Sequence, residues 1–186
     1  ARNMAQRAHC GMADHIRVFV LEDDARTRAS LLRRLNAAAF IETVGDAGAL
    51  AEARDALAAL EVDALLFDLQ LPDGNAIELI REQHLARPDI PVLVISVFGD
   101  EERVIAAIEA GARGYLLKDE PGEDLAESVR RAVEGESPIS PAIARHLIRR
   151  FQMESEKRAN TAENPLSDRE LEVLRLASKG LTYQET

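Results

Sequence analysis

The chain has 186 residues, 46% of them hydrophobic, which is enough for one full domain and part of a second. Its formal net charge of -10 repels a polyanion, which excludes nucleic acid as a partner of the whole surface and restricts any DNA contact to a local patch. No stretch approaches the roughly 18 apolar residues of a membrane span, and no apolar secretory signal opens the chain. We therefore expect a cytoplasmic protein without a membrane partner.

The first residues, ARNMAQRAHCGMAD, are polar, and both Met4 and Met12 are candidates for the natural start. We interpret residues 1–14 as a disordered N-terminal extension or a vector-derived remnant and exclude them from the fold. The single cysteine, Cys10, lies here, cannot form an intramolecular disulfide, and is expected to be incidental.

Short apolar runs alternate with segments of helical periodicity from residue 15 to residue 135. The runs predict strands at 16–21, 40–44, 62–67, 92–95 and 115–117. Apolar residues then recur three or four apart, as a helix facing a core requires. The five stripes are Leu31, Leu32 and Leu35; Leu50, Ala53, Leu57 and Leu60; Ile77 and Ile80; Val104, Ile105 and Ile108; and Leu125, Val129 and Val133. The third stripe is the weakest.

Strands that are apolar throughout need cover on both faces, and a parallel sheet between helices provides it. Right-handed crossovers then predict an α/β domain over residues 15–135 with a doubly wound, five-stranded parallel sheet. Ligands of such sheets bind at the carboxyl ends of the strands.

The pattern changes after residue 135. Ser140 and Pro141 predict the N-cap and first position of a helix, whose apolar side carries Ile143, Leu147 and Phe151. Because residues 154–164 are polar, we expect 136–164 to form a linker helix and linker.

Two capping boxes follow in residues 165–186, one from Ser167 to Glu170 and one from Thr182 to Glu185. They predict the start of an all-helical domain that is incomplete at the end of the chain.

Polar side chains follow four of the predicted strands. They are Glu22, Asp23 and Asp24 after the first strand, Asp68 after the third, Ser96 after the fourth and Lys118 after the fifth. Singly, each has an ordinary interpretation as a turn residue, a helix cap or a surface lysine. With the first, third and fourth strands adjacent, however, they would gather at one edge of the sheet.

This set of carboxylates, a hydroxyl and a cation suits magnesium-assisted phosphoryl chemistry. Mg²⁺ prefers hard oxygen ligands, and it offsets the repulsion between an anionic phosphodonor and an anionic nucleophile. We expect Asp68 to attack phosphorus, while Lys118 and Ser96 contact the phosphoryl oxygens.

Residues 16 to about 135 resemble the receiver domain of two-component response regulators, through VLEDD, LLFDLQLPDG, VLVIS and GARGYLLKD in that order. The resemblance implies a flavodoxin-like fold, Mg²⁺ as cofactor and a role for each residue. Asp68 would be the phospho-acceptor, Glu22 and Asp23 the metal-binding acidic pair, Gln70 a metal ligand through its backbone carbonyl, Ser96 the switch hydroxyl, Lys118 the phosphate-contacting lysine and Tyr115 the aromatic that turns inward when Ser96 moves. The register that pairs Asp23 with Asp24 stays open. Ala76 departs from the family, which usually has glycine there.

The segment LSDRELEVLRLASKGLTYQE resembles the start of the LuxR/NarL-type helix-turn-helix domain. The resemblance implies a transcription regulator that a sensor histidine kinase phosphorylates and that forms a homodimer. The helix that reads bases in this motif is absent here, so the DNA-binding residues are unknown, and promoter DNA is expected to bind the complete parent protein rather than this chain. Thr186 stands where the family prefers an aliphatic residue, which suggests a natural truncation or frameshift as an alternative to a shortened chain.

Three functions follow from these patterns. The first is a phosphorylation-dependent response regulator with a DNA-binding output, and the second is a receiver that acts only through protein contacts. The coding sequence beyond Thr186 would discriminate between them. The third is a Mg²⁺-dependent phosphohydrolase with Asp68 as nucleophile. Haloacid-dehalogenase-type enzymes carry a second aspartate where this chain has Gln70, so we expect no enzyme beyond self-phosphorylation from a donor and self-dephosphorylation.

Overall fold

The computed structural model divides the chain into two units, Ala1–Arg145 and His146–Thr186. It describes residues 15–97, 100–118, 124–145, 147–149 and 152–153. The predicted N-terminal extension, the 154–164 linker and the helix-turn-helix segment lie outside these residues, as does Phe151. Within them, no helix has the length and apolar character needed to cross a membrane.

A five-stranded parallel sheet forms the centre of the first unit. Its strands are β1 (Ile16–Leu21), β2 (Ile41–Ala47), β3 (Ala64–Phe67), β6 (Val92–Ser96) and β7 (Gly114–Leu117), in the order β2-β1-β3-β6-β7. Two further short strands, β4 (Gln70–Leu71) and β5 (Gly74–Asn75), form an antiparallel hairpin after β3. The strand order places the first, third and fourth of the predicted strands side by side, as the sequence led us to expect.

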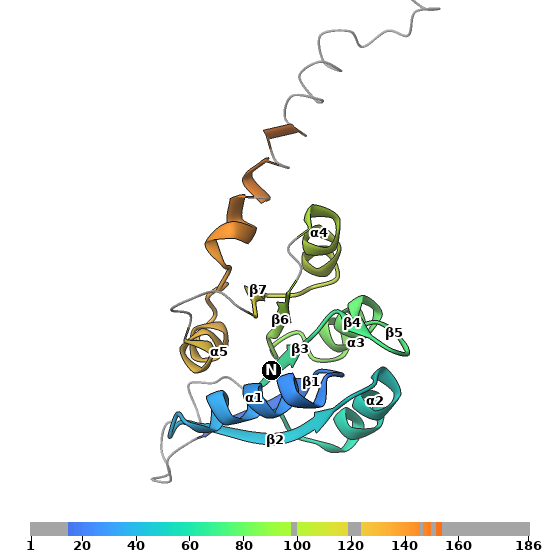
Figure 1. Ribbon diagram of the computed structural model, residues 1–186, viewed down its shortest axis with the longest axis vertical. Coiled ribbons are helices and arrows are strands. Elements are labelled where there is room, and N and C mark those ends of the chain that lie inside the picture. Colours follow the sequence, from blue (N-terminus) through green and yellow to red (C-terminus); the bar gives the residue numbers. More distant parts are fainter. Residues whose placement is uncertain (1–14, 98–99, 119–123, 146, 150–151, 154–186) are drawn as a thin grey trace, which may run out of the picture. The chain divides into compact units, whose positions relative to one another are not determined.

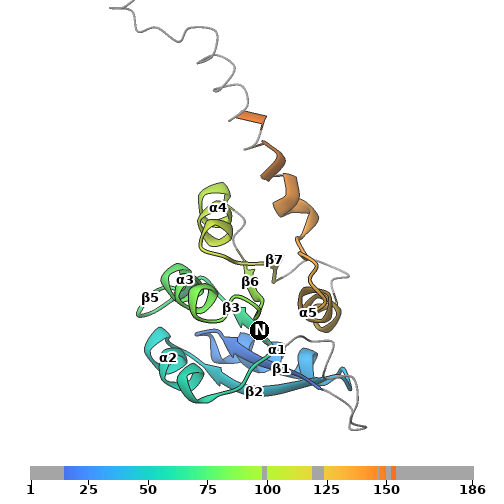
Figure 2. The ribbon, with the colours of Figure 1, turned by 180° about the vertical axis from the view of Figure 1, so that it is seen from behind.

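Helices cover both faces of this sheet. On one face lie α1 (Ala25–Asn36) and α5 (Leu125–Val133), and on the other lie α2 (Leu50–Ala59), α3 (Ile77–Ala86) and α4 (Glu101–Glu109), as Figures 1 and 2 show from opposite sides. The predicted doubly wound, flavodoxin-like α/β fold is therefore confirmed.

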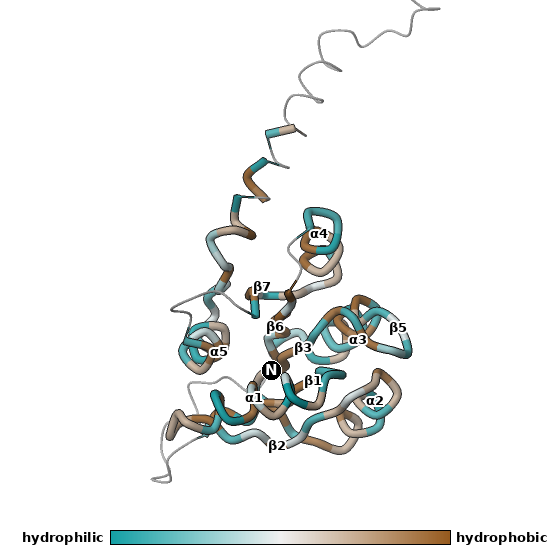
Figure 3. The backbone as a smooth tube through the Cα atoms, in the orientation of Figure 1, coloured by the Kyte–Doolittle hydropathy of each residue, from teal (hydrophilic) through white to brown (hydrophobic). Residues whose placement is uncertain are grey.

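The strands contribute the largest share of the buried core. All residues of β3 and β6 are buried, and Figure 3 shows hydrophobic colour on the central strands and hydrophilic colour on the outer side of α4. Leu31 and Leu35 of α1 and Val129 of α5 complete the core on one face. Each such side chain contributes about 1.5–3 kcal/mol when fully buried, so burial on both faces accounts for the unbroken apolar runs.

In helices α3 and α4, the buried residues differ from the apolar stripes predicted from the sequence. Helix α3 buries Leu79 and Ile80, while Ile77 is only partly covered. Helix α4 buries Val104 and Ala107, which lie three residues apart and therefore on one side. The short Ala107 was not predicted because its side chain gives little hydrophobic signal.

Ala76 has backbone angles that any residue can adopt, so glycine is not required at this position. Its backbone is right-handed, with φ -67° and ψ -8°, directly before α3. The family departure at this position therefore fits the loop without strain.

The N-terminus of α2 is capped from a distant loop. Its own N-cap residue, Ala49, has no side chain that can bond, and Asp73 in the β4–β5 turn accepts hydrogen bonds from Leu50 N (3.0 Å) and Ala51 N (3.2 Å). The bond from Leu50 is the main reason that the pKa of Asp73 is lowered. This contact ties the loop that follows Asp68 to α2.

Replacing Asp73 with asparagine should lower the melting temperature by several degrees at neutral pH. Because folding lowers the pKa of Asp73, its stabilisation is present above the unfolded-state pKa and is lost as the pH falls through the folded-state value. The difference from wild type should therefore shrink in acid, as thermal unfolding at a series of pH values would measure. Asp55→Asn, which makes the same charge change on the exposed face of α2, is the control. Equal changes in melting temperature in the two variants would contradict the role of Asp73 as the cap of α2.

Candidate functional site

The carboxyl ends of β1 and β3 bring three carboxylates together. The strands pair in parallel with Leu21 opposite Phe67, so the next residues, Glu22 and Asp68, leave the sheet side by side. Glu22 is 1% exposed and Asp68 6%. One carboxylate oxygen from each of these two residues and from exposed Asp23 lies within 4.8 Å of the others. The predicted convergence of these residues is observed.

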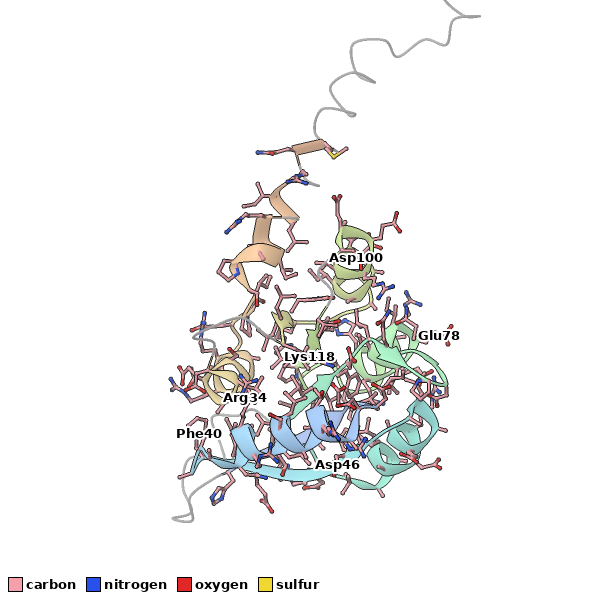
Figure 4. The ribbon with its side chains drawn as sticks, viewed as in Figure 1. Arg34, Phe40, Asp46, Glu78, Asp100 and Lys118 are labelled. Atoms are coloured by element: carbon pink, nitrogen blue, oxygen red, sulfur yellow. The ribbon has the colours of Figure 1, made fainter. Side chains whose placement is uncertain are left out.

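Lys118 reaches this cluster from the end of β7. Its Nζ lies 3.0 Å from Asp68 Oδ2 and 2.5 Å from Glu22 Oε2, and its side chain is 10% exposed. The Lys118 backbone N donates to Ser96 O at 3.0 Å, which extends the β6–β7 pairing up to the site. Figure 4 labels Lys118 in the central part of the domain.

Burial and charge act in opposition on these groups. Burial raises the pKa of Glu22, and the nearby ammonium of Lys118 only partly opposes this. Burial by itself would lower the pKa of Lys118, but the contacts with Glu22 and Asp68 outweigh it and raise that pKa, so the lysine is charged at neutral pH. Glu22 Oε2 nevertheless accepts no hydrogen bond of good geometry. The Lys118 ammonium lies 2.5 Å from this oxygen, so the charge of the buried carboxylate is balanced by an ion pair.

The donor set fits a magnesium ion. The three carboxylates of Glu22, Asp23 and Asp68 each offer one hard oxygen ligand, and these oxygens lie within 4.8 Å of one another. Asp24 has another role, since it caps α1 by accepting from Thr27 N (2.8 Å) and Thr27 Oγ1 (2.7 Å). The structure therefore favours the register in which Glu22 and Asp23 form the acidic pair.

Gln70 begins β4, two residues after Asp68, and its side chain is exposed. With the amide oxygen turned toward Arg103, the side chain accepts hydrogen bonds from that guanidinium. Both residues line a shallow pocket beside the β4–β5 hairpin. The metal-binding role of the Gln70 carbonyl stays a prediction.

Ser96 and Tyr115 lie on neighbouring strands below the site. Ser96 is buried at the end of β6, and Tyr115 is fully buried in β7 opposite Val94. Burial raises the pKa of the Tyr115 hydroxyl to about 12, against the opposing effect of its hydrogen bond with Ser96. The predicted pair is thus in contact, with the tyrosine facing inward; its role as a switch stays a prediction.

Two features near the site were missed from the sequence. Arg28 of α1 donates to the backbone carbonyl of Glu22 at 2.6 Å. The segment 138–140, assigned only to the linker, pairs with β7 through a bridge between Tyr115 and Ile139. Neither follows a helical or strand period, so no sequence pattern indicated them.

Residues 18–130 match the response regulator receiver domain. The chain belongs to the response regulator family. It is 35% identical over 173 residues to the DNA-binding transcriptional activator DevR/DosR of Mycobacterium tuberculosis, covering 91% of this chain and 77% of that protein. It is 31% identical to the oxygen regulatory protein NreC of Staphylococcus carnosus, covering 91% and 80%. These relatives place it among two-component response regulators of the LuxR/NarL type.

Solved structures agree with the fold of this response regulator. The signal receiver domain of NarL from Mycobacterium tuberculosis superposes with a TM-score of 0.62 at 26% identity, covering 66% of this chain and 99% of that one. A LuxR-family response regulator from Aurantimonas sp. SI85-9A1 gives 0.69 at 23% identity, covering 74% and 98%, and supports the fold alone.

Removing the Lys118 ammonium should destabilise the domain by about 3 kcal/mol at neutral pH, because two buried carboxylates lose their cation. Glu22, whose pKa is already raised, would then titrate higher still. A carboxyl whose pKa is raised by folding destabilises the folded state least at low pH, where it is protonated. The loss of unfolding free energy in Lys118→Met should therefore become smaller as the pH is lowered from about 8 to about 5. Urea unfolding in EDTA measures this, with exposed Arg33→Met as the charge control. A loss of stability that does not change with pH would argue against the ion pairs of Lys118 with Glu22 and Asp68.

Proposed function

We propose that this response regulator accepts a phosphoryl group on Asp68 in a Mg²⁺-dependent reaction and thereby controls a transcription output. The observation that carries the proposal is the position of Asp68, buried beside the ammonium of Lys118 and close to the carboxylates of Glu22 and Asp23. Membership of the receiver family supports the same conclusion.

Both oxygens of Asp68 are held by hydrogen bonds. Oδ1 accepts a hydrogen bond from Leu69 N at 2.7 Å, and Oδ2 accepts one from Lys118 Nζ at 3.0 Å. As an Asp68 oxygen forms its bond to phosphorus, the bond between phosphorus and the donor's leaving group breaks in line with it. Lys118 then pairs with a phosphoryl oxygen, and the Ser96 hydroxyl contacts another. Mg²⁺, held by Glu22, Asp23, Asp68 and the Gln70 carbonyl, would supply charge neutralisation.

Hydrolysis of outside substrates is not part of the proposed function. Turnover needs a carboxylate that transfers protons two residues after the nucleophile, and Gln70 stands there with its amide against Arg103. We propose that the phosphoryl group comes from a sensor histidine kinase and promotes homodimer formation. Promoter DNA is the proposed target of the transcription output, in line with the DNA-binding transcriptional activator DevR/DosR.

Strand β7 connects the site with the linker. Tyr115 N donates to Pro138 O and Tyr115 O accepts from Ser140 N, both at 3.0 Å. The buried Ser140 hydroxyl accepts from Leu117 N at 3.1 Å, one residue before Lys118. A side chain at Gly114 would lie 2.6 Å from Pro138 O, so glycine permits this approach. We infer that movement of Lys118 and Tyr115 on phosphorylation passes through these bonds to the helix that begins at Pro141.

Incubation with a small phosphodonor and Mg²⁺ should add one phosphoryl group to the wild-type chain and none to Asp68→Asn. Intact-mass measurement reads the result directly. Exposed Asp89→Asn is the matched control and should label as wild type does. Labelling that persists in Asp68→Asn would overturn the assignment of the acceptor.

Ser140→Ala should weaken the connection between β7 and the linker, since one net hydrogen bond is worth about 1 kcal/mol. In the wild type we expect phosphorylation to change the hydrogen-exchange protection of residues 138–145, and in this variant the change should be smaller at equal phosphorylation. Exposed Ser137→Ala is the control. Identical exchange in the two phosphorylated variants would exclude the proposed route.

A further inference from the structure

The acidic loop between β1 and α1 is fixed by its backbone as well as by its side chains. Glu22 N donates to Ala47 O at 3.0 Å on one side, and the Asp24 cap anchors the other. Between these anchors, Arg28 donates from one guanidinium nitrogen to the carbonyl oxygens of Glu22 (2.6 Å) and Asp23 (3.5 Å). One side chain thus contacts the backbone of both members of the acidic pair.

The guanidinium of Arg28 is itself held in place. Its Nε lies 2.9 Å from Oδ2 of Asp46, a β2 residue opposite Val20 of β1, and Figure 4 labels Asp46 beside α1. At Gly48, an added Cβ would lie 2.8 Å from the Arg28 nitrogen that binds the loop. The Arg28 side chain is 23% exposed and that of Asp46 41%, so the ion pair is only partly shielded from water. An ion pair and a glycine therefore select one position for this side chain.

We propose that Arg28 is a positioning residue for the metal-binding carboxylates. By holding the carbonyls of Glu22 and Asp23, it fixes the direction in which the two side chains leave the loop, and so the spacing of the oxygens that would meet Mg²⁺. Groups that orient metal ligands typically change metal affinity about 10–100-fold when they are removed. This inference rests on the proposed Mg²⁺ site.

The direction of the change in Mg²⁺ affinity when Arg28 is replaced distinguishes a positioning role from a role of its charge. A guanidinium near a cation site repels the cation, so if Arg28 acted through its charge alone, removing it would tighten Mg²⁺ binding. If Arg28 positions the loop, removing it weakens binding in spite of the lost repulsion. Lysine keeps the charge but lacks the planar fork with its fixed geometry, so Arg28→Lys should also bind Mg²⁺ more weakly than wild type.

The experiment is a Mg²⁺ titration of the full chain followed by isothermal titration calorimetry and by the amide NMR signals of Glu22 and Asp23. Arg28→Met should raise the Kd for Mg²⁺ about tenfold and Arg28→Lys by a smaller factor. Arg33→Met, which removes the same charge from the exposed side of α1, should leave the Kd unchanged. At saturating Mg²⁺, phosphorylation of Asp68 in Arg28→Met should recover the wild-type rate, which a general loss of structure would not allow.

Two further variants move the guanidinium without removing it. Gly48→Ala, which changes no charge, should weaken Mg²⁺ binding by displacing the guanidinium, so the test holds even if Arg28→Met does not fold. Asp46→Asn should weaken it further than the loss of one exposed charge in Asp55→Asn does. Wild-type affinity in these variants, or equal or tighter binding in Arg28→Met, would overturn the positioning role while leaving the proposed function intact. Absence of Mg²⁺ binding by the wild type would overturn both.

Discussion

The contact of one ammonium with two buried carboxylates is the interaction on which the site depends. Glu22 and Asp68 would repel each other at the carboxyl edge of the sheet if the Lys118 ammonium did not contact both of them. The lysine offsets only part of the negative charge of the site, because one ammonium faces the three carboxylates of Glu22, Asp23 and Asp68. The pocket is therefore stable enough to fold and still anionic enough to take a cation.

The register of the parallel sheet makes this arrangement possible. Leu21 lies opposite Phe67, so Glu22 and Asp68 leave the sheet at the same level. Phe67 lies opposite Val94 and Ser96 opposite Leu117, so Ser96 and Lys118 follow within two residues of that level. A shift of one residue would turn an acidic side chain into the core, where an unpaired charge is costly. Hydrophobic burial on both faces of the sheet thus fixes the positions of the polar residues at its edge.

Contacts from outside the sheet hold the surrounding loops. Arg28 binds the backbone of the loop after β1, Asp73 ties the hairpin after β3 to α2, and Ser140 ties the segment after α5 to β7. Each joins a loop near Asp68 to an element that has its own place in the fold. These contacts come from parts of the chain that carry none of the chemistry of the site, including the residue before the linker helix.

The order of strands and helices, and the residues that meet at the sheet edge, could be predicted from the sequence. Apolar runs and helical spacing report burial directly, and strand ends fix where Glu22, Asp23, Asp68, Ser96 and Lys118 must lie once the sheet is parallel. Boundaries were less well predicted: β2 extends to Ala47, beyond the predicted end at residue 44, because its last residues pair with β1 although they are not uniformly apolar.

Only the tertiary structure decided how the loops are held. Asp73 caps a helix 23 residues earlier in the chain, and Ser140 binds a backbone amide 23 residues before it. Such contacts follow no period, because they depend on where two separate elements come to rest. The choice between Glu22 and Asp24 for the acidic cluster is of the same kind. The two carboxylates are equivalent in the sequence, and they differ only because one faces β3 and the other caps α1.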